Sequence, residues 1–455
     1  MLLFDDALQL QFKDTSVLEY SPVQYGFRCL MDKNQVLWLG YNEGLSAIEI
    51  GPRKFRQFLA RAERPFFSCR GIRQIGDTLL INSNEPTMLI DLKSGKTKAL
   101  DWHQQERGNR SIKFLPFITA NDGSHWTASE RLYRVSAAGT IMEELIVKED
   151  SFKNIKRIWS FFQDQNDAWW VGVGTGFLYR VSPPPAQKST RFSAYNEFTD
   201  LQDAIIWQFL EDEKGIWIAA QNGLYLLDPE KGIIAHYGIQ QEGKFYLPAE
   251  EFYYIHKDTR DQTYWLATHD GGLLHFSPEA DITYRQFSRS QGLPSNELYT
   301  IIEDAKGQFW ISSAKGLIQL NPETLRFNIY FEEQGITNNE FNRLSYHQTP
   351  DGTIYFGGLN GVTSFHPNDF QEIEQEFPIR LSAVHLTREQ ADGPEDITES
   401  VLQGQPIRFY PHDKLLAIDL SMQDYFHADQ ITYSYQIRSG GRDRKQAWTA
   451  LDNNS

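Results

Sequence analysis

The sequence is poor in cysteine. Only two cysteines, Cys29 and Cys69, occur in 455 residues. Two thiols cannot form a disulfide framework or a four-ligand metal centre, so both classes of small stapled domain are excluded. We expect the two side chains to pack as small buried hydrophobic groups, with a single Cys29–Cys69 bridge as the alternative. Cysteine content therefore leaves the redox compartment open.

Long hydrophobic runs and positive charge are scarce as well. The sequence contains no run of about 18 or more apolar residues, so no segment is expected to cross a membrane as a helix. The first residues, Met1–Asp6, lack the basic and apolar parts of a signal peptide. The formal net charge is -16. Such a surface repels phosphate groups, and no nucleic-acid partner is expected.

Motifs for enzymatic chemistry are also missing. We find no nucleophile elbow, zinc-binding HExxH, phosphate-binding glycine loop or cysteine pair. Carboxylate pairs such as Glu211-Asp212 and Glu303-Asp304 recur with the repeat described below, so we interpret them as turn residues. His256 and His269 are expected to pack or to cap. The sequence predicts no catalytic residue, no metal site and no cofactor.

Aromatic residues are plentiful, at 14% of the chain, and they follow a repeat. The repeat reads as an apolar strand, an acidic turn, a strand led by an aromatic residue, and a glycine before a third apolar strand. The leading residues lie 43 to 48 positions apart, and they are Trp38, Ile81, Trp126, Trp170, Trp217, Trp265, Trp310 and Tyr355. Most units add a fourth strand, such as Arg326–Phe331.

Short strands joined by Asp, Gly and Asn turns predict antiparallel hairpins. Four antiparallel strands in a unit of about 45 residues are typical of a β-propeller blade. A blade is covered by neighbours on both faces, which explains the continuous apolar strands and makes each repeated Trp a filler between blades. The predicted fold class is therefore all-β, a β-propeller.

The number of blades depends on how the ring closes, because an open ring leaves an exposed strand edge. The last unit, Leu344–Pro367, has no good outer strand after it. Lys54–Leu59 would supply that strand for a ring of seven units, and Leu8–Lys13 for a ring of eight. Seven blades are favoured and eight remain possible.

The pattern changes at Pro378. Residues 378–386, Ile407–Tyr410, Leu415–Ser421 and Ile431–Ile437 are predicted strands, and Arg388–Gln405 is a predicted loop. The order suggests a partial β-sandwich of immunoglobulin type. Because about four strands are too few for a complete sandwich, we expect this domain to be truncated.

Particular residues resemble a known family. Glu211-Asp212, Gly215-Ile-Trp217 and Asn222-Gly-Leu224 resemble the two-component regulator propeller repeat. The segments Tyr433–Tyr435 and Trp448–Leu451 resemble the opening half of the three-Y domain that follows such propellers.

The resemblance implies a role and a division of the chain. It implies the extracytoplasmic sensor region of a Bacteroidetes-type hybrid histidine kinase: periplasmic, binding an oligosaccharide or other small ligand, not itself an enzyme, and membrane-attached only through a downstream segment. It also implies signalling, and a possible homodimer, through the three-Y domain. Residues 1–56 would be the tail of a preceding propeller or an extra blade, 57–377 the propeller, and 378–455 the truncated three-Y domain. The alternatives are a secreted carbohydrate-active enzyme, a lyase or glycosidase, and a protein-binding scaffold.

Candidate ligand-binding residues come from the starts of the innermost strands. Propeller ligands usually meet these positions near the central channel. Aromatic faces stack on sugar rings, and charged groups hold hydroxyls. The candidates are Arg70, Arg157, Trp159, Trp207, Glu251, Tyr253, Glu297, Tyr299 and Arg343.

Overall fold

The computed structural model divides into two compact units, Met1–Lys54 and Phe55–Ser455, which are described separately. The residues that the structure describes are 2–4, 10–13, 28–31, 36–41, 44–49, 54–60, 67–84, 86–100, 102, 116–129, 131–145, 157–174, 178–181, 193–194, 201, 204–279, 284–370, 379–388, 393–421, 434–435 and 449–450.

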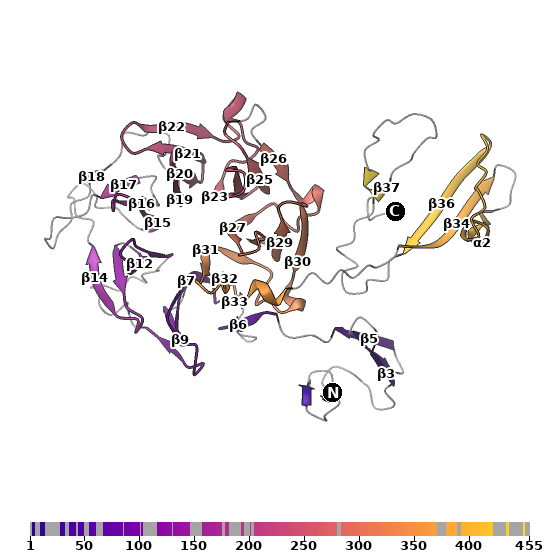
Figure 1. The fold of residues 1–455 in the computed structure, drawn as a ribbon, viewed down its shortest axis with the longest axis horizontal. Helices are drawn as coiled ribbons and strands as arrows, with labels where there is room; N and C mark the ends of the chain where they lie inside the picture. The colour runs from indigo at the N-terminus through magenta and orange to yellow at the C-terminus, as the bar shows by residue number, and fades with distance from the viewer. Residues whose placement is uncertain are drawn as a thin grey trace. The chain divides into compact units, whose positions relative to one another are not determined.

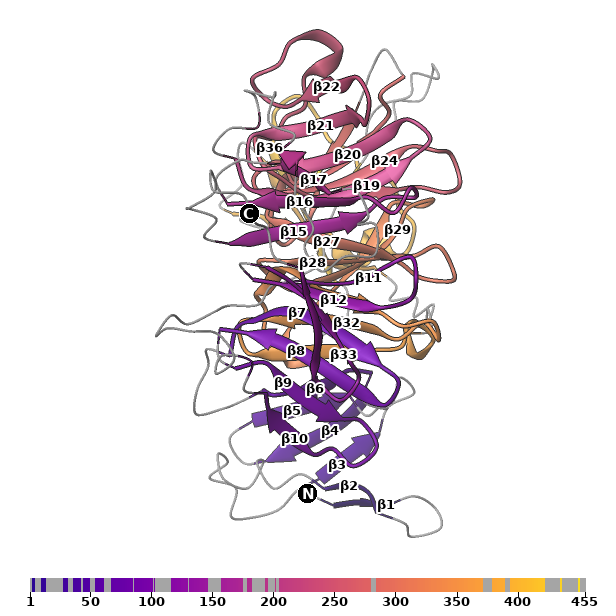
Figure 2. The same cartoon turned by 90° about the vertical axis from the view of Figure 1, so that its left-hand side faces the viewer.

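Seven four-stranded antiparallel sheets form the blades of a propeller (Figure 1). Each of the first six blades takes four consecutive strands, as Figure 2 shows from the side for β7 to β10. These strands are β7 (Cys69–Ile75), β8 (Thr78–Ser83), β9 (Met88–Asp91), β10 (Thr97–Ala99); β11 (Phe117–Thr119), β12 (His125–Ala128), β13 (Leu132–Val135), β14 (Ile141–Leu145); β15 (Ile158–Gln163), β16 (Trp169–Val173), β17 (Leu178–Val181), β18 (Ser193–Ala194); β19 (Ile206–Asp212), β20 (Gly215–Ala220), β21 (Gly223–Asp228), β22 (Gly232–Tyr237); β23 (Phe252–Lys257), β24 (Tyr264–Thr268), β25 (Leu273–Phe276), β26 (Tyr284–Phe287); and β27 (Leu298–Glu303), β28 (Phe309–Ser313), β29 (Leu317–Asn321), β30 (Arg326–Tyr330).

The seventh blade closes the ring. It joins β31 (Phe341–Gln348), β32 (Ile354–Gly358) and β33 (Gly361–Phe365) to β6 (Arg56–Phe58), which comes from the start of this unit. Phe58 pairs with Val362 and Arg56 with Ser364. Gly361 begins β33 with a φ of 94°, and a Cβ there would collide with the Phe58 carbonyl. The seven-blade prediction is confirmed, and the eight-blade alternative is wrong, because the outer neighbour of β33 is β6.

The strands that read as continuous apolar runs are buried throughout. Every residue of β16, β24 and β28 is buried, as expected for a sheet covered on both faces. Trp170, Trp217, Trp265 and Trp310 are among the largest fully buried side chains, which confirms the repeated Trp as a filler between blades.

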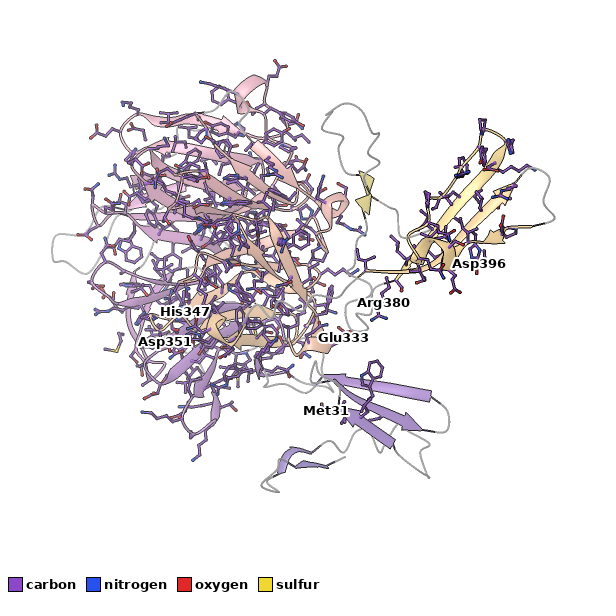
Figure 3. The ribbon with its side chains drawn as sticks, turned by 45° about the vertical axis from the view of Figure 1, so that its right-hand side comes forward. Met31, Glu333, His347, Asp351, Arg380 and Asp396 are labelled. Carbon is purple, nitrogen blue, oxygen red and sulfur yellow. The ribbon has the colours of Figure 1, made fainter. Side chains whose placement is uncertain are left out.

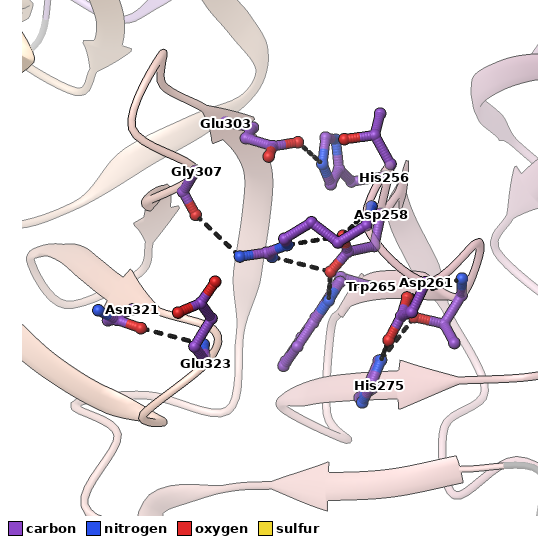
Figure 4. Close-up of polar contacts among 12 residues, drawn as sticks. His256, Asp258, Asp261, Trp265, His275, Glu303, Gly307, Asn321 and Glu323 are labelled. Carbon is purple, nitrogen blue, oxygen red and sulfur yellow. Dashed lines mark hydrogen bonds and ion pairs between the residues drawn. The ribbon is translucent and has the colours of Figure 1, made fainter.

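The acidic turn of the repeat holds this tryptophan in place. Asp258 accepts a hydrogen bond from the Trp265 indole Nε1 at 3.0 Å and pairs with Arg260 at 2.8 Å (Figure 4). The same link joins Asp164 to Trp170 and Asp304 to Trp310. Turn chemistry therefore accounts for these carboxylates. The remaining member of one acidic pair, Glu303, pairs with His256 Nε2 at 3.0 Å.

The Asp258 turn makes stability depend on pH. Burial by itself raises the pKa of this carboxyl, but hydrogen bonds from Arg260 and the Trp265 indole outweigh it and lower the pKa from 3.8 to about 2. A lowered folded-state pKa contributes stability above the unfolded value, about 2 kcal/mol here, which is lost as pH falls from about 4 to about 2. In urea unfolding, the difference in unfolding free energy between wild type and Asp258→Asn should therefore become smaller as the pH falls through this range.

Asp270→Asn, at an exposed carboxylate, is the control. A difference in unfolding free energy for Asp258→Asn that does not change with pH would contradict the assignment.

Blades seven and one meet at a buried amide. Asn342 Nδ2 lies 2.8 Å from the Cys69 carbonyl, 3.0 Å from the Gly358 carbonyl and 3.1 Å from Ser68 Oγ. Cys69 itself is a free, fully buried thiol, and burial raises its pKa. It therefore packs as a small apolar group, as predicted, and forms no bridge. The side chain of Cys29 lies outside the described residues.

The unit Met1–Lys54 contains two small antiparallel sheets. The strands β1 (Leu2–Phe4) and β2 (Leu10–Lys13) pair with each other. The second sheet joins β3 (Arg28–Met31), β4 (Val36–Tyr41) and β5 (Gly44–Glu49), and Figure 3 marks it at Met31.

Beyond the propeller, β34 (Arg380–Arg388) pairs with β36 (Asp413–Ser421) and with β35 (Glu395–Asp396), and Figure 3 marks this sheet at Arg380 and Asp396. Short helices are α2 (Thr398–Leu402), η3 (Gly243–Phe245), η4 (Arg289–Gln291), η5 (Glu332–Gln334) and η6 (Pro367–Asp369); the last described strands are β37 (Ser434–Tyr435) and β38 (Thr449–Ala450).

Two details of the C-terminal prediction are wrong. Ile407–Tyr410 is not a strand, and its last residue is held in a turn: the Tyr410 N–H donates to Asp413 Oδ2 at 2.7 Å, and the Asp413 N–H donates to the Tyr410 carbonyl at 2.9 Å. The predicted loop contains β35 and α2, where Asp396 Oδ1 accepts from the backbone N–H of Thr398 at 2.9 Å. Of the predicted strand Ile431–Ile437, only the two residues of β37 lie within the described part.

A candidate ligand-binding site at the centre of the propeller

The first strands of the blades lie around the centre of the ring (Figure 1), and most of them begin with a one-residue bulge. In five of the seven first strands, the register slips at the second residue. A bulge leaves one residue outside the ladder and re-aims its side chain. The five residues at this position are Arg70, Trp159, Trp207, Tyr253 and Tyr299. All five belong to the set predicted from the sequence.

Three more predicted residues come just before the first paired residue of their strands. Arg157, Glu251 and Glu297 each accept, through the backbone carbonyl, an N–H from the residue that follows the second strand, at 3.0 to 3.1 Å. This bond fixes the backbone at the same place in three blades. The ninth residue, Arg343, lies in a wider bulge of β31 between Phe341 and Tyr346.

A cavity of about 210 Å³, called the central cavity below, opens among these positions. Five of the nine predicted residues line it, together with three that the prediction missed. The lining residues are Arg70, Ser83, Asn84, Arg157, Trp159, Trp207, Arg343 and Leu344. The other four predicted residues, Glu251, Tyr253, Glu297 and Tyr299, do not line the cavity but are joined to its wall.

Aromatic rings form a continuous chain along that wall. Trp159 contacts Trp207 with 5.3 Å between ring centroids, Trp207 contacts Tyr253 at 5.4 Å, and Tyr253 contacts Tyr299 at 5.7 Å. Trp207, Tyr253 and Tyr299 are at most 4% exposed, whereas Trp159 is only half-buried. The three buried rings therefore build the wall, and Trp159 is the ring of this chain that stays partly exposed.

Arginines stack on this chain. The Arg343 guanidinium lies 5.0 Å from the Trp207 ring and 4.8 Å from the Tyr253 ring, and Arg157 lies 5.1 Å from the Trp159 ring. Burial lowers the pKa of Arg70, and the nearby charges of Arg343 and Arg157 lower it further. The three guanidinium groups therefore act on one another as a cluster of positive charge.

The two carboxylates next to the aromatic wall, Glu251 and Glu297, already accept hydrogen bonds from it. Trp207 Nε1 donates to Glu251 Oε1 at 2.8 Å. Tyr253 shares its hydroxyl between His269 Nδ1 at 2.9 Å and Glu297 Oε1 at 3.4 Å. Burial raises the pKa of Glu251 and of the Tyr253 hydroxyl. This network holds the aromatic wall in position.

Two of the residues that the sequence prediction missed share one position in the repeat. Asn84 and His269 occupy equivalent positions in their blades. The backbone N–H of Asn84 donates to the Ser68 carbonyl, and that of His269 to the Glu251 carbonyl; each acceptor directly precedes the first strand of its blade. Ser83 ends β8, and Leu344 lies in the wide bulge of β31 with a φ of 62°. A column of the repeat alignment at the end of the second strand would have found Asn84 and His269.

The described residues contain no group of three or more His, Cys, Asp or Glu side chains placed to hold a metal ion. Within the same residues, no helix is both long and apolar enough to span a membrane.

Fold and cavity define the class of protein: a seven-bladed β-propeller with an arginine- and aromatic-lined cavity on its axis. Comparison with known proteins adds the kind of propeller. The two component regulator propeller family matches residues 292–315, which include all of β27 and β28. The predicted resemblance to that repeat is thereby confirmed.

Two longer similarities agree with this match. The chain is 23% identical over 264 residues to histidine kinase P4 of Formosa agariphila, a similarity that covers 54% of this chain and 18% of the kinase. It also shares the fold of the extracellular domain of a hybrid two component system from B. thetaiotaomicron, with a TM-score of 0.63 and 19% identity, over 94% of this chain and 56% of that one. The chain thus spans about half of the solved domain and less than a fifth of the kinase.

Proposed function

We propose that this chain belongs to the extracytoplasmic, periplasmic sensor region of a hybrid two-component histidine kinase, and that it binds an oligosaccharide in the central cavity. The observation that carries the proposal is the half-buried ring of Trp159 beside three guanidinium groups. A flat ring suits the C–H face of a sugar, and guanidinium groups suit its oxygen atoms.

The proposal extends to the division of the chain. Residues 1–54 are the end of a preceding propeller, 55–377 the sensing propeller with β6 as its closing strand, and 378–455 the first part of a three-Y domain. A ligand that prefers one arrangement of the propeller shifts the equilibrium of the attached three-Y domain, through which the protein would also dimerise. The kinase would then respond without any chemistry in the sensor region.

Calorimetry on the purified chain with a panel of neutral and acidic oligosaccharides tests binding. One class of glycan should bind, and Trp159→Ala should weaken it about tenfold or more, equivalent to about 1.4 kcal/mol. Trp159 is preferable to the buried Trp207, whose loss would also remove wall packing. Trp38→Ala, in the other unit, is the control. Binding by no member of the panel, together with an unchanged transcriptional response to those glycans when the full-length gene is deleted, would contradict the proposal.

A further inference from the structure

Three arginines that line the central cavity have no anionic partner. Among the described residues, Arg70, Arg157 and Arg343 form no ion pair and donate no side-chain hydrogen bond, whereas Arg260 pairs with Asp258 at 2.8 Å and Arg388 with Glu395 at 3.2 Å. The chain has 60 acidic residues against 44 Lys and Arg, so carboxylates are in excess. A shortage of carboxylates therefore does not explain why these three arginines lack ion pairs.

Gathering these charges is unfavourable in the free protein. All three guanidinium groups are partly buried, and desolvation disfavours a charged group. The like charges of Arg343 and Arg157 act against that of Arg70. Stacking of Arg343 and Arg157 on aromatic rings offsets a part of this cost and leaves the N–H groups without acceptors. A bound anion would offset the rest.

The three side chains come from rigid elements. Arg70 is the bulged residue of β7, Arg157 directly precedes β15, and Arg343 lies in the bulge of β31. They therefore reach the central cavity from blades one, three and seven. Guanidinium groups held in this way match the planar, two-oxygen edge of a carboxylate or the oxygens of a sulfate ester.

The described carboxylates near the central cavity interact with the aromatic wall and do not pair with the three arginines. Glu251 and Glu297 are bound to Trp207, Tyr253 and His269, as described above. Glu340, which precedes β31, acts on the Tyr299 hydroxyl electrostatically. These carboxylates lie on blades five to seven. Arg343, on blade seven, is near enough for its charge to lower the pKa of Glu251, whereas Arg70 and Arg157 approach from blades one and three.

We propose that the central cavity recognises an acidic sugar, with Arg70, Arg157 and Arg343 holding a carboxylate or sulfate group and Trp159 facing the sugar ring. This inference rests on the proposed function and narrows its ligand class.

Titration with D-galacturonate and with inorganic sulfate tests the anion site directly. Both should bind wild type, and Arg70→Gln or Arg343→Gln should weaken binding about tenfold or more, with affinity falling as salt rises. Arg285→Gln is the matched control, since Arg285 also stacks on an aromatic ring, Phe287 at 4.9 Å, away from the cavity. Preferential binding of galacturonate would assign a uronic acid, and preferential binding of sulfate a sulfated sugar. Equal binding of both anions by wild type and the two cavity variants would overturn the inference.

Thermal unfolding supplies a readout that a merely structural role would not give. Arg70→Gln removes a disfavoured buried charge, so its Tm should equal or exceed that of wild type while anion binding is lost. A neutral oligosaccharide that binds at least as tightly as its acidic counterpart, and equally to Arg343→Gln, would overturn the acidic-sugar inference but leave the proposed sensor function standing. Anion binding without any oligosaccharide binding would confirm an anion site at the three arginines but contradict the proposed oligosaccharide-binding function.

Discussion

Replacing Phe55 with alanine is expected to lower the free energy of unfolding by about 3–5 kcal/mol. Phe55 lies just before the closing strand β6 and is 5% exposed. Its ring packs against Tyr330 and Phe365, each at 5.4 Å, and Phe370 at 5.1 Å. These contacts anchor a three-residue strand that has few hydrogen bonds of its own. Loss of the anchor should therefore weaken the closure as well as the core.

Two measurements separate closure from packing. Urea unfolding gives the loss of stability, and hydrogen exchange at Val362 and Ser364 reports the pairing of β33 with β6. Arg56→Ala is the control, because this exposed side chain lies 5.6 Å from the Phe58 ring and forms no ion pair among the described residues, so its loss should cost less than about 1 kcal/mol. A chain shortened to begin after Ala60 should leave β33 as an open edge and associate. Unchanged exchange at β33 in Phe55→Ala would show that β6 closes the ring without this anchor.

The closure of the propeller ring could be predicted from the sequence because it depends on the repeat pattern. The repeat located the blades, and the last blade lacked an outer strand, which therefore had to come from another part of the chain. Lys54–Leu59 fitted, and β6 lies within it. Where the local pattern is overridden, the prediction failed: Ile407–Tyr410 has the composition of a strand, but Tyr410 is held in a turn by Asp413.

The candidate site shows the same division. Counting positions along the repeat located Arg70, Trp159 and the other residues that begin the first strands. It could not tell which aromatic rings stay partly exposed, because that depends on side chains from distant blades. Trp207 is buried partly by Arg343, which lies three blades further along the ring. The role of His269 was also hidden, since its partners Tyr253 and Glu297 belong to two different blades.

Replacing Trp310 with alanine is expected to be as damaging as replacing Phe55, with a loss of about 3–5 kcal/mol. Trp310 is fully buried and packs against Phe365 at 4.4 Å and Phe370 at 4.8 Å. Its indole Nε1 donates to Asp304 Oδ2 at 2.9 Å, so the side chain serves both the core and the acidic turn. Trp310→Phe would separate the two roles by keeping most of the ring while removing the donor.

Trp217 provides the matched comparison. It is equally buried and occupies the same position of its blade, but among the described residues its Nε1 makes no hydrogen bond to the aspartate of its turn, and its ring packs against Tyr264 at 4.9 Å. The aspartate of that turn, Asp212, accepts instead from the Tyr264 hydroxyl at 2.5 Å. A hydrogen bond to a buried carboxylate contributes about 1.5–3 kcal/mol, so Trp310→Phe should cost more than Trp217→Phe by about that amount.

A double-mutant cycle completes the test. Coupling between Asp304→Asn and Trp310→Phe should be of the order of 1.5–3 kcal/mol, because each substitution removes the same charged hydrogen bond. The corresponding coupling between Asp212→Asn and Trp217→Phe should be smaller, because these two residues are joined through Tyr264, which donates to Asp212 and packs on Trp217. Both cycles can be measured by urea unfolding at neutral pH. Equal coupling in the two blades would mean that the Trp is retained for its volume alone, and that the acidic turn does not hold it.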